Sequence, residues 1–535
     1  MQLQQVIVLA WLGYSGVYAK DVQECELLAN QSYICRELES FEQLQQYVQD
    51  DWVAVRVVNA RHTGLENGDE PLPKLRKLQQ LDLSQSGGLT LGALGFRDFA
   101  ALQQLNLSHC QLEQLLAKQF AAAAPLRNLD VSHNDLQLIS SELLQQLPNL
   151  VYANFSNNLI AELQLDAFKS LKQLLYLQLD TNELENVTIG ANAQLQHLHM
   201  SNNNLRDFRW CQLRGLPQLR ELHLHSNWLE QLDSGIFYAL PQLRVLNVSN
   251  NNIYAIERSL FLGAEPQLQL LDFSSNNVKQ LEDYVFSKLG RLETLNLWYN
   301  SISSIGACAF RQLRALQTLQ LQGNAIAVLP AELFANLTAL RVLNLSHNKL
   351  QQLGAHVFGS TLLRNLSYVD LSYNSLQQLH ALAFSSLPFL LELRLQRNKL
   401  LQLDIRNFAP LRRLQLLTLS ENRLLQLDED VLSTFDKLQL LEINNNQLSY
   451  LPALAPHYLP HLQHIQIEGN PWQCSCLDEL TSWLHQRQVV YTRAGSAYYS
   501  GQKPLCVVTP TPMQQCLRDL LAVQALGIVQ HYEQI

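Results

Sequence analysis

The 535-residue chain has few charged residues, since Asp, Glu, Lys and Arg together make up only 16% of it. Its net charge is −9, and no stretch is rich in Lys or Arg. Nucleic acid and anionic membrane surfaces are therefore poor partners for it. The low charge does not indicate disorder, because 47% of the residues are hydrophobic and can form a large core.

Long apolar runs are also missing. The first 19 residues hold one short apolar stretch and end in the small-residue site Val17–Ala19, so we interpret residues 1–19 as a signal peptide. The run Leu520–Val529, within a C-terminal tail of residues 517–535, is too short to cross a bilayer. We expect a secreted, extracellular protein without a membrane span.

The motifs of common enzyme classes are missing as well. The sequence contains no GxSxG, no HExxH, no phosphate-binding loop and no dinucleotide-binding fingerprint. We therefore expect no enzymatic activity, and no residue pattern calls for a cofactor.

Leucine, in contrast, is in large excess, with 114 residues or about a fifth of the chain. The segment Leu102-Gln-Gln-Leu105-Asn-Leu107-Ser-His-Cys110 recurs 24 residues later as Leu126-Arg-Asn-Leu129-Asp-Val131-Ser-His-Asn134. This frame, LxxLxLxxN, can be followed 17 times between Leu78 and Asn470. Its LxL alternation predicts a short strand that is buried on one side, and such copies stack in parallel to share one core.

Two further positions repeat with the frame. The interior Asn residues, such as Asn134, Asn158 and Asn182, should align in a column and satisfy backbone groups of the turn that leaves each strand. A phenylalanine nine to eleven residues after the Asn should pack the returning segment against the core; these residues are Phe237, Phe261, Phe286, Phe310, Phe334, Phe358, Phe384 and Phe408.

This pattern resembles the leucine-rich repeat family in its 24-residue extracellular form. The resemblance implies an α/β solenoid, a right-handed horseshoe with a parallel β-sheet on its concave face and mostly irregular or short helical segments on its convex side. Toll-type receptor ectodomains look similar. Secreted members of the family act in innate immunity, guidance, adhesion or as carriers of other proteins.

The nine cysteines are concentrated at the two ends of the chain. The segment Asn470–Leu484 resembles the cysteine-rich C-terminal cap of the family, which implies the disulfides Cys474–Cys506 and Cys476–Cys516. Cys25 and Cys35 are expected to bridge in an N-terminal cap, before a first capping strand at Val53–Val57. The expected domains are the N-terminal cap at 20–77, about 17 repeats at 78–470, and the C-terminal cap at 471–516.

Three cysteines remain within the repeats. Cys110 takes the Asn position of its repeat, and we interpret it as an inert core thiol. Cys211 and Cys308 share an outer position but lie four repeats apart, which is too far for a disulfide within one chain. A dimer through Cys211 or Cys308 is one interpretation, and two half-buried free thiols are the other.

Three patches stand out among the strand positions that should face solvent. The His cluster comprises His197, His199, Glu221, His223 and His225 on two adjacent strands. It could bind a metal ion such as Zn²⁺ or Cu²⁺ or become charged below about pH 6.5, or it could simply fill a tolerant polar face.

The second and third patches carry the residue types of protein interfaces. The aromatic pair is Trp298 and Tyr299, for which packing on neighbouring residues is the alternative. The Tyr–Arg patch could equally be a solvated, salt-bridged surface; it comprises Tyr368, Asp370, Tyr373, Glu392, Arg394 and Arg397.

Eight Asn-x-Ser/Thr sequons are candidate glycosylation sites; they are Asn30, Asn106, Asn154, Asn186, Asn247, Asn336, Asn344 and Asn365. Four of them, Asn106, Asn154, Asn247 and Asn344, belong to the predicted strands, although the repeat frame itself also favours the sequence Leu-Asn-Leu-Ser. Glycans there would leave the three patches open.

These observations predict a secreted, non-catalytic protein-recognition scaffold. Its partner would be an extracellular protein ligand or receptor, bound through the concave or a lateral face. The alternatives are a cell-surface adhesion or receptor-like protein and a structural protein of the extracellular matrix.

Overall fold

The computed structural model describes most of the chain. The described residues are 25–29, 31–36, 41–49, 52–58, 73–164, 166–261, 267–453, 458–491, 506–507 and 515–518, with small gaps at 88, 90, 92–94, 97, 122, 124 and 235. The predicted signal peptide, the sequon Asn30 and residues 519–535 of the predicted tail lie outside them. The chain forms two compact units, Met1–Leu136 and Gln137–Ile535, which are described in turn.

The first unit begins with a hairpin. Strands β1 (Cys25–Ala29) and β2 (Ser32–Arg36) are antiparallel, and Cys25 lies opposite Cys35, to which it is disulfide-bonded. Helix α1 (Phe41–Tyr47) follows, and β3 (Ala54–Val58) pairs in parallel with β2. Strand β3 is the capping strand that the sequence predicts at Val53–Val57.

The remainder of the first unit contains three copies of the leucine frame. Their strands are parallel and in register, with β3 pairing β4; they are β4 (Gln80–Asp82), β5 (Gln104–Asn106) and β6 (Asn128–Asp130). The central leucines of these strands are at most 2% exposed and form a continuous column. Two 3₁₀ turns return the chain, η1 (Pro73–Lys77) and η2 (Ala117–Phe120).

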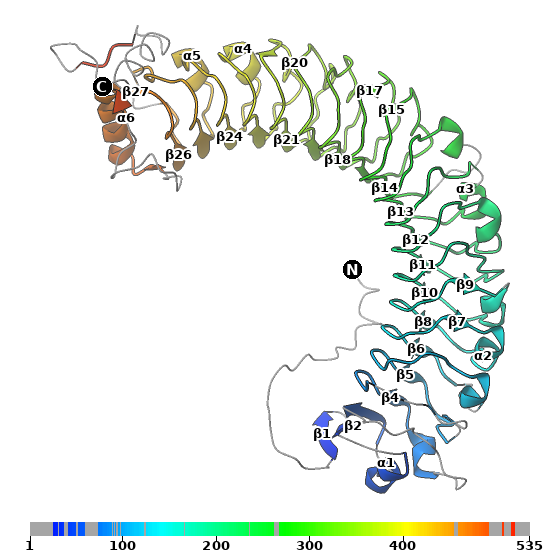
Figure 1. Ribbon diagram of the computed structural model, residues 1–535. Helices are drawn as coiled ribbons and strands as arrows, with labels where there is room; N and C mark the ends of the chain where they lie inside the picture. The colour runs from blue at the N-terminus through cyan, green and yellow to red at the C-terminus, as the bar shows by residue number, and fades with distance from the viewer. Residues whose placement is uncertain are drawn as a thin grey trace, which may run out of the picture. The chain divides into compact units, whose positions relative to one another are not determined.

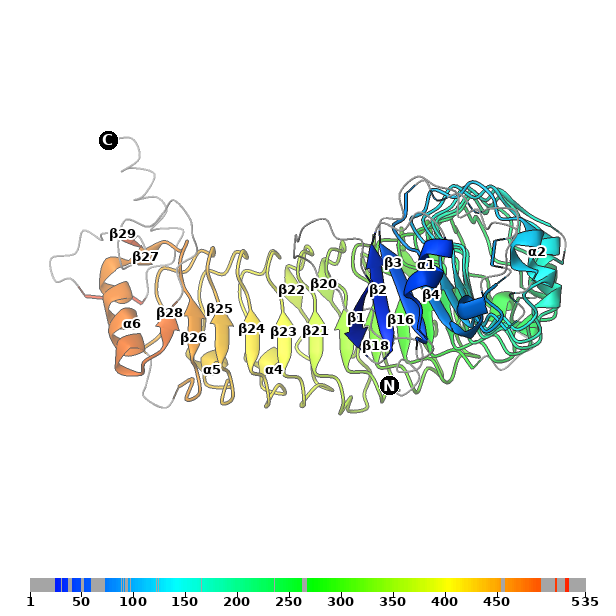
Figure 2. The ribbon, with the colours of Figure 1, turned by 90° about the horizontal axis from the view of Figure 1, so that it is seen from below.

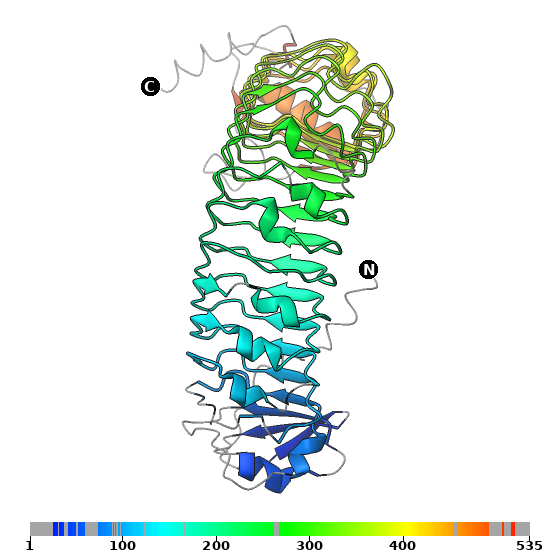
Figure 3. The ribbon, with the colours of Figure 1, turned by 90° about the vertical axis from the view of Figure 1, so that its right-hand side faces the viewer.

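The second unit is a solenoid in which each copy of the frame contributes one strand of three residues. Neighbouring strands are parallel and in register, so that Leu177 lies opposite Ala153 and Leu198. Figures 2 and 3 show these strands side by side, running in the same direction. They are β8 (Tyr152–Asn154), β10 (Tyr176–Gln178), β11 (His197–His199), β12 (Glu221–His223), β13 (Val245–Asn247), β14 (Leu270–Asp272), β16 (Thr294–Asn296), β18 (Thr318–Gln320), β19 (Val342–Asn344), β21 (Tyr368–Asp370), β23 (Glu392–Arg394), β24 (Leu416–Thr418), β25 (Leu440–Glu442) and β26 (His464–Gln466).

Within the second unit the strands line the inner side of a curve, and the returning segments lie outside it (Figure 1). The returning segments are mostly irregular, as the sequence predicts, with short helices and three pairs of two-residue strands. The helices are α2 (Ser141–Gln145), η3 (Ala167–Ser170), η4 (Trp210–Leu213), α3 (Ile236–Ala239), η5 (Arg258–Phe261), α4 (Ile405–Phe408) and α5 (Glu429–Leu432). The pairs are β7 (Leu138–Ile139) with β9 (Glu162–Leu163), β15 (Gln280–Leu281) with β17 (Ser304–Ile305), and β20 (Gln352–Leu353) with β22 (Gln378–Leu379).

The predicted phenylalanine column is present in the second unit. Its eight rings are at most 1% exposed, and neighbouring ring centroids lie 5.2–6.4 Å apart from Phe237 to Phe408. Phe435 continues it, with its centroid 5.6 Å from that of Phe408. The rings therefore fill the space between the inner sheet and the outer segments.

The asparagine column also makes the bonds that the sequence predicts. Asn182 Nδ2 donates to the carbonyls of Phe155 (3.0 Å) and Leu179 (3.1 Å), and Oδ1 accepts from the Ile160 N–H (3.1 Å). Each such side chain joins its own repeat to the preceding one. Cys110 partly replaces this amide, since its buried thiol lies 3.1 Å from the Leu83 carbonyl.

One regular feature was not predicted from the sequence. The residue directly before the asparagine position has a positive φ in every copy of the frame, from Gln85 (63°) through Tyr299 (49°) to Gly469 (66°). Only two of these 17 residues are glycine, Gly323 and Gly469. Most residues other than glycine avoid this left-handed conformation. The hydrogen bonds around the turn must therefore hold these residues in it.

The C-terminal cap closes the second unit. Helix α6 (Cys474–Gln486) buries Leu477, Leu480 and Leu484, and β28 (Val490–Tyr491) pairs with the last repeat strand, β26. Strands β27 (Trp472–Gln473) and β29 (Cys506–Val507) are parallel neighbours. Disulfides join Cys474 to Cys506 and Cys476 to Cys516, the pairs that the resemblance implies. The cap therefore covers both the leucine core and the free strand edge.

Candidate functional site

The inner sheet of the second unit presents one or two side chains per strand to solvent. In each three-residue strand the middle residue is buried, and one or both flanking residues are partly exposed because strand side chains alternate. The His cluster and the Tyr–Arg patch begin at these flanking positions, whereas the aromatic pair follows strand β16; the residues of each patch are brought together.

Four residues of the His cluster lie on β11 and β12, and His225 follows β12. In the parallel register His197 lies opposite Glu221, and His199 lies opposite His223, so the four side chains form a square on one face of the sheet. The ring centroids of His199 and His223 are 4.4 Å apart, and that of His225 is 6.4 Å from that of His223. All five side chains are half-buried.

Carboxylates pair with two of these imidazoles. His197 Nδ1 lies 2.9 Å from Glu221 Oε2, and its ring stacks on Tyr176 with centroids 4.1 Å apart. His199 Nδ1 lies 3.8 Å from Oδ2 of Asp180, whose other oxygen accepts hydrogen bonds from the N–H and hydroxyl of Ser201. The short contact orients His197 and Glu221 relative to each other, and the longer one places a carboxylate beside His199.

Burial determines the protonation of the cluster. Burial, with His199 as the next cause, lowers the pKa of His223 to about 4, and burial also lowers the pKa of His199. The hydrogen bond from His197 lowers the pKa of Glu221. At neutral pH the cluster therefore holds two neutral imidazoles beside an ionised carboxylate. The idea that the whole cluster becomes charged below about pH 6.5 is disfavoured, because charging His199 and His223 requires a lower pH.

The aromatic pair differs in exposure between its two members. Tyr299 is 59% exposed, whereas Trp298, which the sequence analysis took as exposed, is half-buried because it packs edge-on against Tyr299 with ring centroids 5.3 Å apart. The next repeat carries Gly323 in the left-handed position, where a Cβ would lie 2.4 Å from the Tyr299 ring. The glycine thus makes room for the tyrosine.

The Tyr–Arg patch is cross-linked by polar contacts. The Tyr368 hydroxyl donates to Asp370 (3.1 Å), Arg394 pairs with Glu392 (2.5 Å), and the Arg394 guanidinium lies 5.4 Å from the Tyr368 ring centroid. Burial, and secondly the Asp370 carboxylate, raises the pKa of Tyr368, so that this phenol stays protonated.

In the structure the Tyr–Arg patch continues along the positive-φ residues that directly precede the asparagine position in successive repeats. The His347 ring stacks on Tyr373 with centroids 4.0 Å apart, Arg397 lies 4.8 Å from the Tyr373 centroid, and Arg397 pairs with Glu421 (2.8 Å). We call His347, Tyr373, Arg397 and Glu421 the rim ladder. The sequence analysis missed His347 and Glu421, although the shared position before the asparagine would have identified both.

Exposed Trp228 was also missed. It is 55% exposed and directly follows Asn227, in the same repeat as His223 and His225. A tryptophan at a position where other repeats carry small, polar, charged or aliphatic side chains is the signal that could have identified it.

The four strand sequons have a structural role. Asn106, Asn154, Asn247 and Asn344 each accept at Oδ1 a hydrogen bond of 3.0 Å from the N–H two residues later. Aspartates make the same contact in other repeats, as Asp82 does with Ser84. Asn154 is only 8% exposed, whereas Asn186, Asn336 and Asn365 on the outer segments are exposed. Glycosylation therefore stays a prediction, with the outer sequons as its better candidates.

The three free cysteines differ in exposure. Cys110 is buried, and burial raises the pKa of its thiol to about 12, in keeping with an inert core thiol. Cys211 is exposed, and Cys308 is half-buried. Among the residues described, no helix has the length and apolarity needed to cross a membrane.

Comparisons with known proteins agree with this geometry. The sequence profile described as "Leucine rich repeat" matches more than half of the chain, at residues 124–184, 217–265, 266–326, 316–366, 364–424 and 412–471. A second profile, "Leucine Rich repeats (2 copies)", matches residues 193–237. A search of curated proteins gave no significant match.

Several solved structures share the fold. A leucine-rich repeat protein of Leptospira interrogans is 27% identical, with a TM-score of 0.62 over 81% of this chain and 100% of that one. A chain of the Drosophila Toll–Spatzle complex is 19% identical, with a TM-score of 0.55 over 83% of this chain and 78% of that one. The functional domain of InlJ from Listeria monocytogenes is 20% identical, with a TM-score of 0.51 over 74% and 77% of the two chains.

Proposed function

Because this chain belongs to the leucine-rich repeat family, we propose that it is a secreted, non-catalytic scaffold that binds an extracellular protein through the inner surface of its second unit. The observation that carries this proposal is the Tyr–Arg patch with the rim ladder. Tyrosine and arginine are the residue types that most often dominate binding energy at protein interfaces.

The patch is held in place before any partner arrives. Tyr373 is stacked between His347 and Arg397, and Arg397 is in turn fixed by Glu421. A side chain that is already ordered loses less conformational entropy on binding, so such a surface binds more strongly than a mobile one of the same composition. Tyr373 and Arg397 nevertheless remain exposed.

The surface around the patch is large enough for a protein partner. The 14 repeat strands of the second unit, at a spacing of about 4.8 Å, give an inner surface about 60 Å long. A standard protein interface needs about 800 Å² per partner. The sheet is also rigid, because every repeat is tied to its neighbour by strand pairing and the asparagine column.

The cysteines support an extracellular location. Six of the nine form disulfides, and all three bridges lie in the two caps. Disulfides of this kind persist in oxidising compartments. Immune recognition, adhesion or guidance, and a carrier role are the processes in which such a scaffold would serve.

Affinity capture from native extracellular fluid tests the proposal. We expect the full-length protein to capture a defined protein partner, and the double variant Tyr373→Ala/Arg397→Ala to lose at least about tenfold in affinity. Tyr238→Ala is the matched control, because Tyr238 is 61% exposed on the outer helix α3. Equal loss in both variants, or no loss in either, would contradict binding through the Tyr–Arg patch.

Two other functions make different predictions in the same preparation. A cell-surface adhesion or receptor-like protein would be released from cells only by detergent or phospholipase, and a matrix protein only by denaturant. A disulfide-linked dimer is compatible with each function and would form through Cys211, the exposed thiol, or Cys308. Non-reducing electrophoresis distinguishes the dimer from a monomer.

A further inference from the structure

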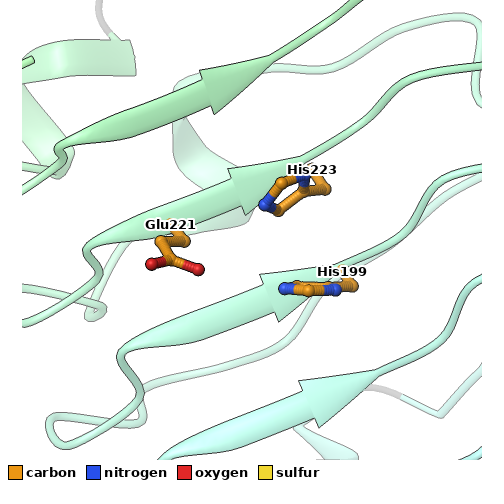
Figure 4. Close-up of side chains that lie close together, drawn as sticks. All are labelled: His199, Glu221 and His223. Carbon is orange, nitrogen blue, oxygen red and sulfur yellow. The ribbon is translucent and has the colours of Figure 1, made fainter. Parts of the chain in front are cut away.

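We propose that His199, Glu221 and His223 form a binding site for Zn²⁺ or a similar divalent transition-metal ion on the inner sheet of the second unit. One ligand atom from each residue lies within 4.8 Å of the other two. Figure 4 shows the three side chains projecting from β11 and β12 into the same space, with the two imidazoles side by side and the carboxylate facing them.

The strand register produces this arrangement. Glu221 and His223 are two residues apart on β12 and therefore point to the same face, and His199 is the direct neighbour of His223 on β11. Zinc forms bonds of about 2.0–2.2 Å to imidazole nitrogen and carboxylate oxygen, so ligand atoms of a tetrahedral site lie about 3.4 Å apart. Ligand atoms at the upper bound of 4.8 Å would therefore approach one another by about 1.4 Å through side-chain rotation to coordinate one ion.

The surrounding groups match a metal site. His199 directs Nδ1 at Asp180, which leaves Nε2 for the ion, and Ser201 holds the Asp180 carboxylate in place. His197 binds one oxygen of Glu221 and leaves the other oxygen for the ion. Ligating histidines in proteins usually have such a carboxylate on their second nitrogen, and it orients the ring and raises its basicity.

The number of ligands suits a metal ion as well. Three protein ligands leave at least one coordination position open to water, because zinc is commonly four-coordinate.

The ligand types of the site favour transition-metal ions over Ca²⁺ and Mg²⁺. Two nitrogen ligands favour zinc, copper or nickel ions, whereas Ca²⁺ and Mg²⁺ prefer oxygen ligands throughout. The His cluster thus differs from a surface that attracts any cation by charge alone. The inference does not depend on the proposed function, since metal binding needs no protein partner.

Calorimetry on the full-length, chelator-treated protein tests the inference, with ZnCl₂ at pH 7.4 as the titrant. We expect one zinc ion per chain at this site and no heat with CaCl₂. His199→Ala and His223→Ala should each weaken zinc binding by more than about 100-fold, and Asp180→Asn by about tenfold. The matched control is His109→Ala/His133→Ala, which removes the stacked pair of imidazoles in the first unit, and it should leave this binding unchanged.

Co²⁺ provides a second measurement that reports on coordination. Its visible absorption should show bands of bound cobalt in the wild type and the control variant but not in His223→Ala, while circular dichroism shows that all three proteins are folded. The absence of zinc heat, or wild-type zinc affinity in both His199→Ala and His223→Ala, would overturn the inference.

Discussion

At the scale of single residues, the asparagine column is the feature that joins successive repeats through side-chain hydrogen bonds. Each side chain donates to two carbonyls and accepts from one N–H; leucine has no polar group, and serine has only one hydrogen to donate, so neither could make this set of bonds. The groups it satisfies are backbone groups of two successive repeats, which cannot reach water. The identity of this residue should therefore matter more than its volume.

Replacing Asn324 tests this role. Asn324 Nδ2 donates to the Leu297 and Leu321 carbonyls, and Oδ1 accepts from the Ile302 N–H. We expect Asn324→Ala to lower the free energy of unfolding by about 3 kcal/mol, because three buried backbone groups lose their partner. Urea unfolding measures the loss. The exposed Asn204 is the control, and Asn204→Ala should change stability by less than about 0.5 kcal/mol.

The thiols provide a second test at this scale. Cys110 is buried with its pKa raised to about 12, whereas Cys211 is exposed. Because the thiolate is the reactive form, a thiol-specific reagent at pH 8 should label Cys211 within minutes and leave Cys110 unlabelled until the protein is denatured. Peptide mapping of the labelled protein identifies the sites. Labelling of native Cys110 at the rate of Cys211 would contradict its burial.

At the scale of elements, the C-terminal cap stabilises the end of the second unit. Helix α6 covers the last leucines, and β28 pairs with β26. Gln473 adds a link to the chain beyond the helix, since its amide donates to the Leu517 carbonyl (2.8 Å) and accepts from the Leu517 N–H (3.1 Å). In a repeat array each repeat contacts only its neighbours, so damage to the cap should remain local.

Removing one bridge of the cap tests this expectation. Cys474→Ser/Cys506→Ser should cost about 2–4 kcal/mol of local stability, because the denatured cap is no longer constrained. Hydrogen exchange should accelerate in β25 and β26, which lie next to the cap, and stay unchanged in β11 and β12. Cys211→Ser serves as the control. Faster exchange throughout the second unit would mean that the array unfolds as one block.

At the scale of the whole molecule, the two units repeat one design. A strand of three residues, a left-handed turn and a returning segment form one copy, and the next copy begins about 24 residues later. No copy can bury its leucines alone, so stability comes from stacking and grows with the number of copies. The protein should therefore tolerate the deletion of a whole repeat but not the deletion of part of a repeat.

Deleting one complete repeat tests this property. Removal of residues 316–339 brings Leu340 to the place of Leu316, and β19 can then pair with β16 in the original register. We expect a folded protein with the circular dichroism of a sheet and a somewhat lower unfolding midpoint. Removal of residues 316–327 breaks the frame and should give a protein that is sensitive to proteolysis. Equal behaviour of the two deletions would contradict the repeat as the unit of folding.

Much of this architecture follows from the sequence. The LxL alternation of the frame predicts a short strand with one buried side. The equal spacing of the copies then brings neighbouring strands into register. The three disulfides agree with the residues that the cap resemblance and the end cysteines indicate. The positive φ of the 17 residues before the asparagine position was not predicted, because only two of these residues are glycine and the rest vary in type from Asn and His to Tyr, Arg and Glu.

The sequence by itself determined the repeat, the inner sheet and the face of the sheet to which each strand side chain points, because strand alternation and a fixed period are properties of the chain alone. It did not determine exposure, since Asp370, predicted to face solvent, is only 7% exposed. Only the tertiary structure decided how those side chains combine. It brought Asp180 to His199, paired His197 with Glu221, and joined His347, Tyr373, Arg397 and Glu421 into one ladder. These contacts depend on rotamers, burial and the distance between neighbouring strands, and no spacing in the sequence specifies them.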